Sequence, residues 1–231
     1  MTGAGPKLVI FDCDGTLIDS QHMIVAAMTD AFAAEGLNVP TRDRVVGVVG
    51  LSLDIAIAHL VPEGSDLDRV ERLADAYKQS FAERRRRAEH IEPLYEGVRE
   101  TLEMLAARDG VVLAIATGKS RRGVDVVLER EGLRDFFSSI QTADNHPSKP
   151  HPSMIMTAMV ETSASPADTV MIGDTTYDIE MALAAGTSSI GVSWGYHAET
   201  ALRSAGAHEI THDCAALERA LDRIIFQRLT A

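Results

Sequence analysis

The chain has 231 residues, of which 45% are hydrophobic and 24% charged, and it carries a formal net charge of −12 at pH 7. These values are typical of a globular protein with a buried core and exclude a disordered or collagen-like chain. Proteins that bind nucleic acids or anionic membranes usually carry excess positive charge, so we expect neither partner. The two cysteines, Cys13 and Cys214, cannot form a zinc site by themselves, and nothing in the sequence indicates an oxidising compartment.

Four short apolar runs predict buried strands, and Ser138–Gln141 and Glu209–Thr211 are weaker strand candidates. The four runs are nearly continuous rather than strictly alternating, which is typical of a parallel sheet covered by helices on both faces. The expected strands are Leu8–Phe11, Val111–Ala116, Ser138–Gln141, Thr169–Ile172, Ser188–Val192 and Glu209–Thr211. The expected helices are Tyr95–Ala107, Arg121–Glu131, Pro152–Val160, Tyr177–Ala185 and Ala215–Arg228. This alternation predicts a doubly wound α/β fold.

Residues 20–92 break the alternation of strands and helices. They contain no convincing strand, but apolar residues recur at helical spacing, as at Met23, Ala27 and Ala31. The pattern therefore predicts a helical module inserted after the first strand. The run Leu8–Phe11 is too short for a signal peptide or a membrane span, and no later run is longer than a buried strand needs. We expect a cytoplasmic protein.

Two aspartates, Asp12 and Asp14, directly follow the first expected strand. Side chains two residues apart on an extended backbone point the same way, and ligands of open α/β sheets bind beyond the carboxyl ends of the strands. Two carboxylates this close repel each other unless a cation lies between them, and their oxygens suit Mg²⁺. The alternative is that both belong to an ordinary Asp-Gly turn.

Three further groups stand at the ends of expected strands or the starts of expected helices. Thr117 and Gly118 follow the second strand and offer a hydroxyl group and an N–H to a phosphoryl oxygen, or else cap the next helix. Lys149 lies between two prolines and suits a contact to phosphate and carboxylate, or else is an exposed loop lysine. Asp174 and Asp178 share one helix face and suit a divalent cation, or else offset the helix dipole.

Taken together, these residues resemble the motifs of the haloacid dehalogenase superfamily of aspartyl phosphohydrolases. The matching pieces are Asp-Cys-Asp-Gly-Thr at 12–16, Thr117, Lys149 and Gly-Asp-Thr-Thr-Tyr-Asp at 173–178, in that order. The long gap after the first piece is where members with a helical cap carry it. The resemblance spans nearly the whole chain and implies a Rossmann-like core at 1–19 and 93–231 with an inserted all-helical cap at 20–92.

The resemblance also implies a role for each matching residue. Asp12 would be the nucleophile that forms an aspartyl-phosphate. Asp14 would protonate the leaving oxygen and later deprotonate the attacking water. Thr117 and the N–H of Gly118 would bind phosphoryl oxygens, while Lys149 would neutralise charge on the phosphoryl group and on Asp12. The expected activity is phosphomonoester hydrolysis, because this set supplies the positioning and charge neutralisation that phosphoryl transfer needs.

The expected cofactor is Mg²⁺. The resemblance implies that Asp12, the main-chain carbonyl of Asp14 and Asp174 hold the ion, with Asp178 at or just behind the site. Thr16, the last residue of the first motif, is expected to contact the substrate.

Several readings remain open within the superfamily. Asp14 argues against a dehalogenase, whose chemistry releases no alkoxide that needs a proton. Phosphonoacetaldehyde hydrolases use a cap lysine, and the only lysine at 20–92 is Lys78, on an expected amphipathic helix. A sugar phosphomutase keeps both aspartates and is an alternative, as is a non-catalytic binding module. Gly186 and the segment Gly191–His197 resemble the phosphoglycolate phosphatase branch, which makes 2-phosphoglycolate the first substrate candidate.

The cap is expected to choose the substrate, a small phosphorylated metabolite. The stretch Val45–Ser52 resembles the loop that faces the active site in capped members, so Gly50 is a candidate contact. Arg42 is a candidate for binding a substrate carboxylate, with solvated helix-start charge as the alternative for it and Arg44. The basic run 84–87 covers every side of a helix and predicts surface salt bridges. The sequence leaves a monomer or a homodimer open.

Overall fold

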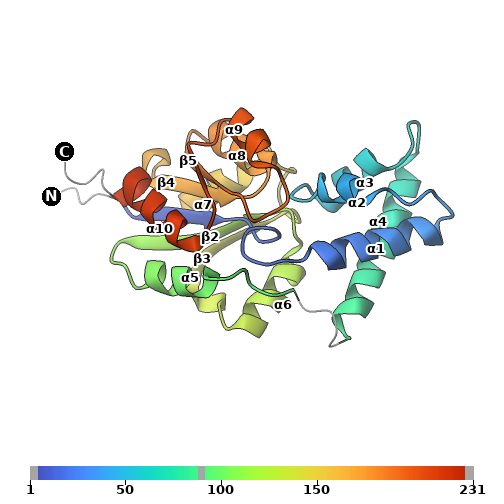
Figure 1. The fold of residues 1–231 in the computed structure, drawn as a ribbon, viewed down its shortest axis with the longest axis horizontal. Helices are drawn as coiled ribbons and strands as arrows, with labels where there is room; N and C mark the ends of the chain where they lie inside the picture. The colour runs from blue at the N-terminus through green and yellow to red at the C-terminus, as the bar shows by residue number, and fades with distance from the viewer. Residues whose placement is uncertain (1–4, 88–91, 227–231) are drawn as a thin grey trace.

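The computed structural model describes residues 5–87 and 92–226 of the chain. Its centre is a sheet in which six strands all run parallel, in the order β3-β2-β1-β4-β5-β6 (Figure 1). This is the order of a doubly wound Rossmann fold. The strands are β1 Lys7–Phe11, β2 Val111–Thr117, β3 Phe137–Thr142, β4 Thr169–Gly173, β5 Ser188–Val192 and β6 Glu209–Thr211. The six predicted strands and the α/β fold class are confirmed.

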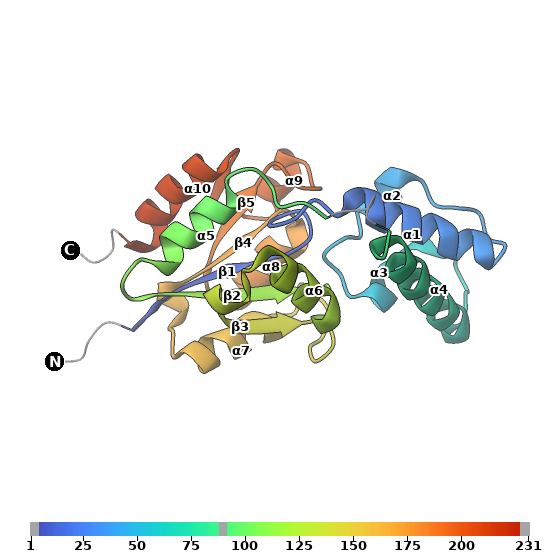
Figure 2. The same ribbon diagram turned by 90° about the horizontal axis from the view of Figure 1, so that it is seen from below.

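Helices cover both faces of the sheet, as the apolar strands require (Figure 2). One face packs against α5 (Val98–Ala106), α6 (Arg121–Glu131) and α10 (Cys214–Leu221). The other face packs against α7 (Ser153–Thr162) and α8 (Thr176–Ala184). Each face thus buries a separate apolar core, and the sheet is the middle of three layers.

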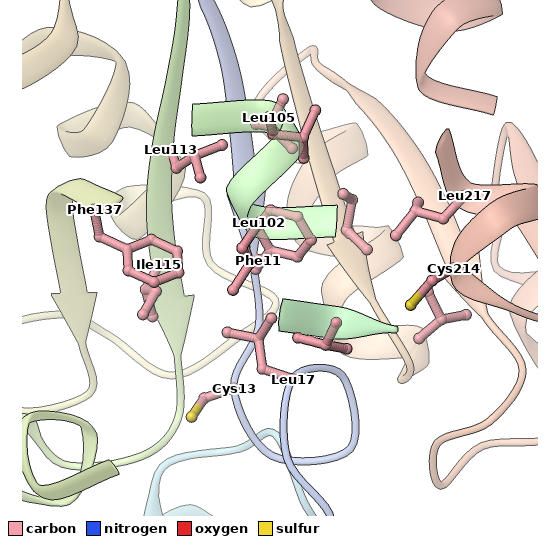
Figure 3. Packing of buried hydrophobic residues seen from close by; sticks show 14 of the residues in the cluster. Phe11, Cys13, Leu17, Leu102, Leu105, Leu113, Ile115, Phe137, Cys214 and Leu217 are labelled. Atoms are coloured by element: carbon pink, nitrogen blue, oxygen red, sulfur yellow. The ribbon is translucent and has the colours of Figure 1, made fainter. Parts of the chain in front are cut away.

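Successive side chains of a strand point to opposite faces of the sheet, so they pack in different cores. Along β1, Val9 and Phe11 point to the core beneath α5, while Leu8 and Ile10 point to the core beneath α7. Figure 3 shows Phe11 in the first of these cores together with Leu102 of α5. Because β1 is buried on both faces, its carboxyl end is held firmly, and this end carries Asp12.

The inserted segment forms the predicted helical cap. Its helices are α1 (Gln21–Ala34), α2 (Arg42–Val46), α3 (Leu53–Leu60) and α4 (Leu67–Arg85), and the described part of 20–92 contains no strand. The cap has an apolar core of its own, which includes Phe32. Figures 1 and 2 show the cap beyond the carboxyl ends of the strands, and it is joined to the core by two chain crossings.

Two details at the C-terminal end depart from the predicted elements. The helix expected over Ala215–Arg228 is α-helical only to Leu221 and continues as a π-helical turn over Asp222–Phe226, and Arg228 lies outside the described residues. The short helix α9 (Glu199–Ser204) was not predicted. Only Leu202 of α9 is buried, so the sequence carries no periodic apolar pattern there. Short 3-10 turns also stand at Arg134–Phe136 and Pro166–Asp168.

Within the described residues, no helix has the length and apolar character that a membrane crossing requires.

The packing of α5 on the sheet gives a first testable prediction. Leu102 has no exposed surface, whereas Met104, two residues along the same helix, is 36% exposed. Replacing Leu102 by alanine leaves a cavity in the core and should lower the free energy of unfolding by about 2–5 kcal/mol. The change Met104→Ala is the matched control and should cost less than about 1 kcal/mol. Urea unfolding followed by circular dichroism measures both, and equal losses would contradict this account of the core.

Candidate active site

The sequence-predicted residues meet at the carboxyl ends of three neighbouring strands. Asp12 follows β1, Thr117 ends β2, and Asp174 follows β4. Lys149 reaches the same place from the loop before α7, and Asp178 reaches it from the first turn of α8. All five residues are buried. The parallel sheet therefore brings together residues that lie up to 166 positions apart (178 − 12 = 166).

Lys149 is the link between two of the carboxylates. Its Nζ lies 3.0 Å from Oδ1 of Asp12 and donates a hydrogen bond of 2.6 Å to Oδ1 of Asp178. Burial lowers the pKa of Lys149, but the two carboxylates outweigh this effect and raise the pKa above its usual value. The lysine therefore stays charged and is not the exposed loop lysine of the alternative interpretation.

Asp12 has one oxygen bound and one oxygen free of protein partners. Oδ1 accepts a hydrogen bond of 2.7 Å from the N–H of Cys13 and faces Lys149, while Oδ2 is buried and has no hydrogen-bond partner among the described residues. The pKa of Asp12 is about 6: burial raises it most, and Asp178 adds to this rise, while Lys149 and the Thr117 hydroxyl group lower it. A buried oxygen without a partner is costly, so this atom is suited to a ligand.

Asp174 accepts hydrogen bonds from the core segment that precedes the cap and from the core segment that follows it. Oδ1 accepts a hydrogen bond of 2.8 Å from the Thr16 hydroxyl group, and Oδ2 accepts one of 2.8 Å from the N–H of Tyr196. Burial and the nearby charges of Asp178 and Asp12 raise the pKa of Asp174 well above its usual value. Because Thr16 is fully buried and its hydroxyl group binds Asp174, its contact in this structure is to the carboxylate cluster.

Gly15 is required by this arrangement. Its backbone has φ of +86°, and a Cβ built on it would lie 2.2 Å from Oδ2 of Asp174. Any side chain there would displace the aspartate as well as strain the backbone. The Asp-Gly step that follows Asp12 is thus more than an ordinary turn, because it lets Asp174 approach.

The carboxylates Asp12, Asp174 and Asp178 form a cluster that fits a metal ion. One oxygen of each lies within 4.8 Å of the others, and all three residues are buried. Both oxygens of Asp178 already have partners, since Oδ1 binds Lys149 and Oδ2 accepts hydrogen bonds from the N–H and hydroxyl group of Thr175. The three carboxylates offer the hard oxygen ligands that Mg²⁺ prefers.

Asp14 belongs to a second charge cluster beside the first. Its Oδ1 accepts hydrogen bonds of 2.5 Å from the Ser20 hydroxyl group and 2.7 Å from Nζ of Lys119. Nζ of Lys119 also donates a hydrogen bond of 3.0 Å to Oε1 of Glu92, whose other carboxylate oxygen binds Arg85 of α4. The side chains of Lys119 and Glu92 are 8% and 1% exposed.

A loop of the cap covers the site. Its segment 47–52 bonds to the core at two points: the Tyr177 hydroxyl group donates to the carbonyl of Gly47 at 3.0 Å, and the N–H of Ser52 donates to the Ser148 hydroxyl group at 2.9 Å. A Cβ built on Gly118 would lie 2.5 Å from the carbonyl oxygens of Gly50 and Leu51. Gly50, predicted as a contact, thus lies directly over Gly118.

Other predicted cap residues make their contacts outside the carboxylate cluster. The Arg42 side chain is 60% exposed and contacts Gln21 and Asp43, so it matches the alternative of a solvated helix-start charge. Arg44 binds the carbonyls of His59 and Leu60 at the end of α3. The Lys78 side chain is 62% exposed, unlike a Schiff-base lysine in a closed site.

The basic run 84–87 divides between two roles. Arg84 forms the expected surface salt bridge, with Asp30 of α1 at 2.7 Å. Arg85, whose side chain is 19% exposed, turns inward to Glu92. The expectation of a surface salt-bridged run therefore holds for Arg84 and is wrong for Arg85, because Glu92 is fully buried and requires a cation.

Sequence reasoning missed the residues that surround Asp14. Lys119 stands directly after Thr117-Gly118, and this position next to a predicted site motif was the available signal. Ser20 and Glu92 carry no motif, and only the fold brings them to Asp14 through the two chain crossings of the cap.

The parallel sheet, the inserted cap and the carboxylate–lysine cluster define a Rossmann-like phosphatase of the capped class. The sequence matches the family model described as haloacid dehalogenase-like hydrolase over residues 9–192. It is 37% identical over 207 residues to the probable phosphatase IndB of Dickeya dadantii (strain 3937), covering 86% of each chain. It is 33% identical over 208 residues to a phosphoglycolate phosphatase of Vibrio vulnificus (strain YJ016), covering 85% of this chain and 88% of that one.

A solved structure agrees with these relatives. A hydrolase from Pseudomonas syringae superimposes with a TM-score of 0.83 and 27% identity, covering 95% of this chain and 99% of that one. The chain belongs to the haloacid dehalogenase-like hydrolases and is a phosphatase of that family. The resemblance to the phosphoglycolate phosphatase branch is confirmed.

The contact between Gly118 and the cap loop gives a second testable prediction. Adding one methyl group through Gly118→Ala places Cβ against two backbone carbonyls that cannot rotate away, so the loop 47–52 must shift. We expect kcat/KM for phosphate esters to fall by about 10- to 100-fold, since displacements of about 1 Å near a site cost this much. Gly132→Ala is the control, because nothing lies within 4 Å of its Cβ position, although its positive φ adds some strain. Unchanged activity in Gly118→Ala would show that the loop is not in this position during turnover.

Proposed function

We propose that this phosphatase hydrolyses the monoester of a small anionic metabolite, with Mg²⁺ as cofactor and an aspartyl-phosphate intermediate. The observation that carries the proposal is the carboxylate of Asp12, buried beside Lys149 with Oδ2 free of protein hydrogen bonds. A buried carboxylate that is oriented on one oxygen and bare on the other suits nucleophilic attack. We take residues 20–92 as the cap and 1–19 with 93–231 as the core.

In the first half-reaction, Oδ2 of Asp12 attacks phosphorus and forms a new O–P bond while the bond to the ester oxygen breaks. The departing oxygen takes a proton from the carboxyl group of Asp14, so that an alcohol leaves instead of an alkoxide. Lys149 lies against Asp12 and offsets the negative charge that collects there. Thr117 and the N–H of Gly118 hold the phosphoryl oxygens.

In the second half-reaction, water attacks the phosphorus of the aspartyl-phosphate. Asp14, now a carboxylate, takes the proton of the water, and the bond between Asp12 and phosphorus breaks. Phosphate leaves, and both aspartates return to their starting states. One group, Asp14, serves as the acid in the first half and as the base in the second.

The charge of the cluster supports a divalent cation. The carboxylates of Asp12, Asp174 and Asp178 face a single neutralising lysine, Lys149. Three buried negative charges against one positive charge are costly, and a divalent cation removes the excess. Asp12 and Asp174 would bind Mg²⁺ with the main-chain carbonyl of Asp14, while Asp178 supports Lys149 from behind. When bound, Mg²⁺ neutralises charge on the transferring phosphoryl group.

The substrate class follows from the cap. The backbone of Gly50 and Leu51 presses on Gly118, so a substrate enclosed here has to be small or the cap has to open for it. The relative from Vibrio vulnificus is named phosphoglycolate phosphatase, and this supports 2-phosphoglycolate as the first candidate. Closure of the cap would exclude water until Asp12 is phosphorylated.

Phosphate release from a panel of esters tests the proposal. The panel holds 2-phosphoglycolate, sugar phosphates and nucleotides, each with Mg²⁺ and with EDTA. We expect Mg²⁺-dependent release that falls by at least about 1,000-fold in Asp12→Asn and by about 100- to 10,000-fold in Asp14→Asn. Asp75→Asn, whose carboxyl group is 81% exposed, is the matched control and should behave like the wild type.

Two outcomes would overturn the proposal. Release that survives Asp12→Asn would exclude the aspartyl-phosphate, and full activity in EDTA would exclude the metal. Interconversion of sugar phosphates without net release would establish the phosphomutase alternative instead.

A further inference from the structure

We propose that Lys119 is a positioning residue for the carboxyl group of Asp14, held in place through Glu92 by Arg85 of the cap. This inference rests on the proposed role of Asp14 as acid and base. It adds a residue, and a link to the cap, that the motifs around Asp12 do not contain.

The two hydrogen bonds to Asp14 make its oxygens unequal. The Ser20 hydroxyl group and Nζ of Lys119 both donate to Oδ1, at 2.5 Å and 2.7 Å, and Oδ2 receives neither bond. A carboxyl oxygen that accepts from an ammonium group is a poor place for the acidic proton. Oδ2 is therefore the oxygen left to face a leaving group. Two donors on one oxygen also fix the rotation of the carboxyl plane.

Lys119 is itself fixed on its far side. Its Nζ donates to Oε1 of Glu92 at 3.0 Å, and Arg85 binds the other oxygen of Glu92 with its Nε at 2.8 Å. The ring of Phe81 lies beneath both cations, 5.3 Å from Nζ of Lys119 and 5.0 Å from the guanidinium carbon of Arg85. A flexible lysine thus has little freedom, because Asp14, Glu92 and the Phe81 ring all contact its ammonium group.

The four groups form a chain of alternating charge that crosses from core to cap. Asp14 and Lys119 belong to the core, Glu92 stands at the second crossing of the chain, and Arg85 lies at the end of α4. Ser20, the other donor to Asp14, stands at the first crossing. Removing α4 from its place would take Arg85 away from buried Glu92, and Glu92 would then draw Lys119 from Asp14. The orientation of Asp14 therefore depends on the position of the cap.

The effect of the leaving group on kcat/KM distinguishes a positioning role of Lys119 from a role in stabilising the fold. An alkyl phosphate releases a strongly basic oxygen that needs the proton of Asp14, whereas p-nitrophenyl phosphate releases a stable anion that needs it little. We compare kcat/KM for glycerol phosphate and p-nitrophenyl phosphate in one sample of each enzyme, with Mg²⁺ present. The ratio of the two values does not depend on how much of the sample is folded.

We expect Lys119→Met to lower kcat/KM about 100-fold for the alkyl ester and less than about 10-fold for the aryl ester, with the loss in kcat. Lys119→Arg keeps the positive charge and the hydrogen-bond donor. Its ratio of kcat/KM for the two esters should return most of the way to the wild-type value. Lys78→Met makes the same change at a lysine whose side chain is 62% exposed, and its ratio should equal that of the wild type. In an Asp14→Asn background, Lys119→Met should leave the ratio unchanged, because its effect acts through Asp14.

The outcomes distinguish the two proposals. Equal losses on both esters, or a change of ratio in the Asp14→Asn background, would overturn the positioning role. If activity depends on Asp14 but the ratio of kcat/KM for the two esters is unchanged in Lys119→Met, this inference alone is overturned. A wild-type enzyme that releases phosphate from neither ester and from no member of the panel would overturn the proposed function and this inference with it.

Discussion

The ion pairs of Lys149 are the interaction on which the rest of the site depends. A charge with no exposed surface is tolerated only when partners surround it, and Asp12 and Asp178 lie within 3.0 Å and 2.6 Å of Nζ. The same lysine opposes the rise that burial causes in the pKa of Asp12. It thereby orients Asp12 on one oxygen and leaves the other bare.

Around this pair the chain arranges charge in two separate clusters. The first gathers three carboxylates and one lysine and is short of positive charge, which suits a cation and a phosphoryl group. The second alternates acid and base from Asp14 to Arg85 and is balanced. The unbalanced cluster is suited to bind a cation and a phosphoryl group, whereas the balanced cluster holds its own members, Asp14 included, in place.

The glycines at the site explain how the clusters come so close. Gly15 lets Asp174 approach the loop after β1, and Gly118 lets the backbone of the cap loop rest on the end of β2. In both places a single methyl group would overlap with neighbouring atoms. The fold therefore removes side chains where two polar segments have to touch.

The sequence by itself determined the strands, most helices and the residues of the first cluster, because period, turn residues and motif spacing are local properties of the chain. It placed Asp12, Lys149 and Asp174 at strand ends, and a parallel sheet must bring such ends together. Only the tertiary structure decided that Arg85 turns inward and that Arg42 stays in solvent. It also decided that Ser20 binds Asp14 and that Glu92 binds Lys119. These contacts join segments that no local pattern relates, so they exist only once the cap has folded back onto the core.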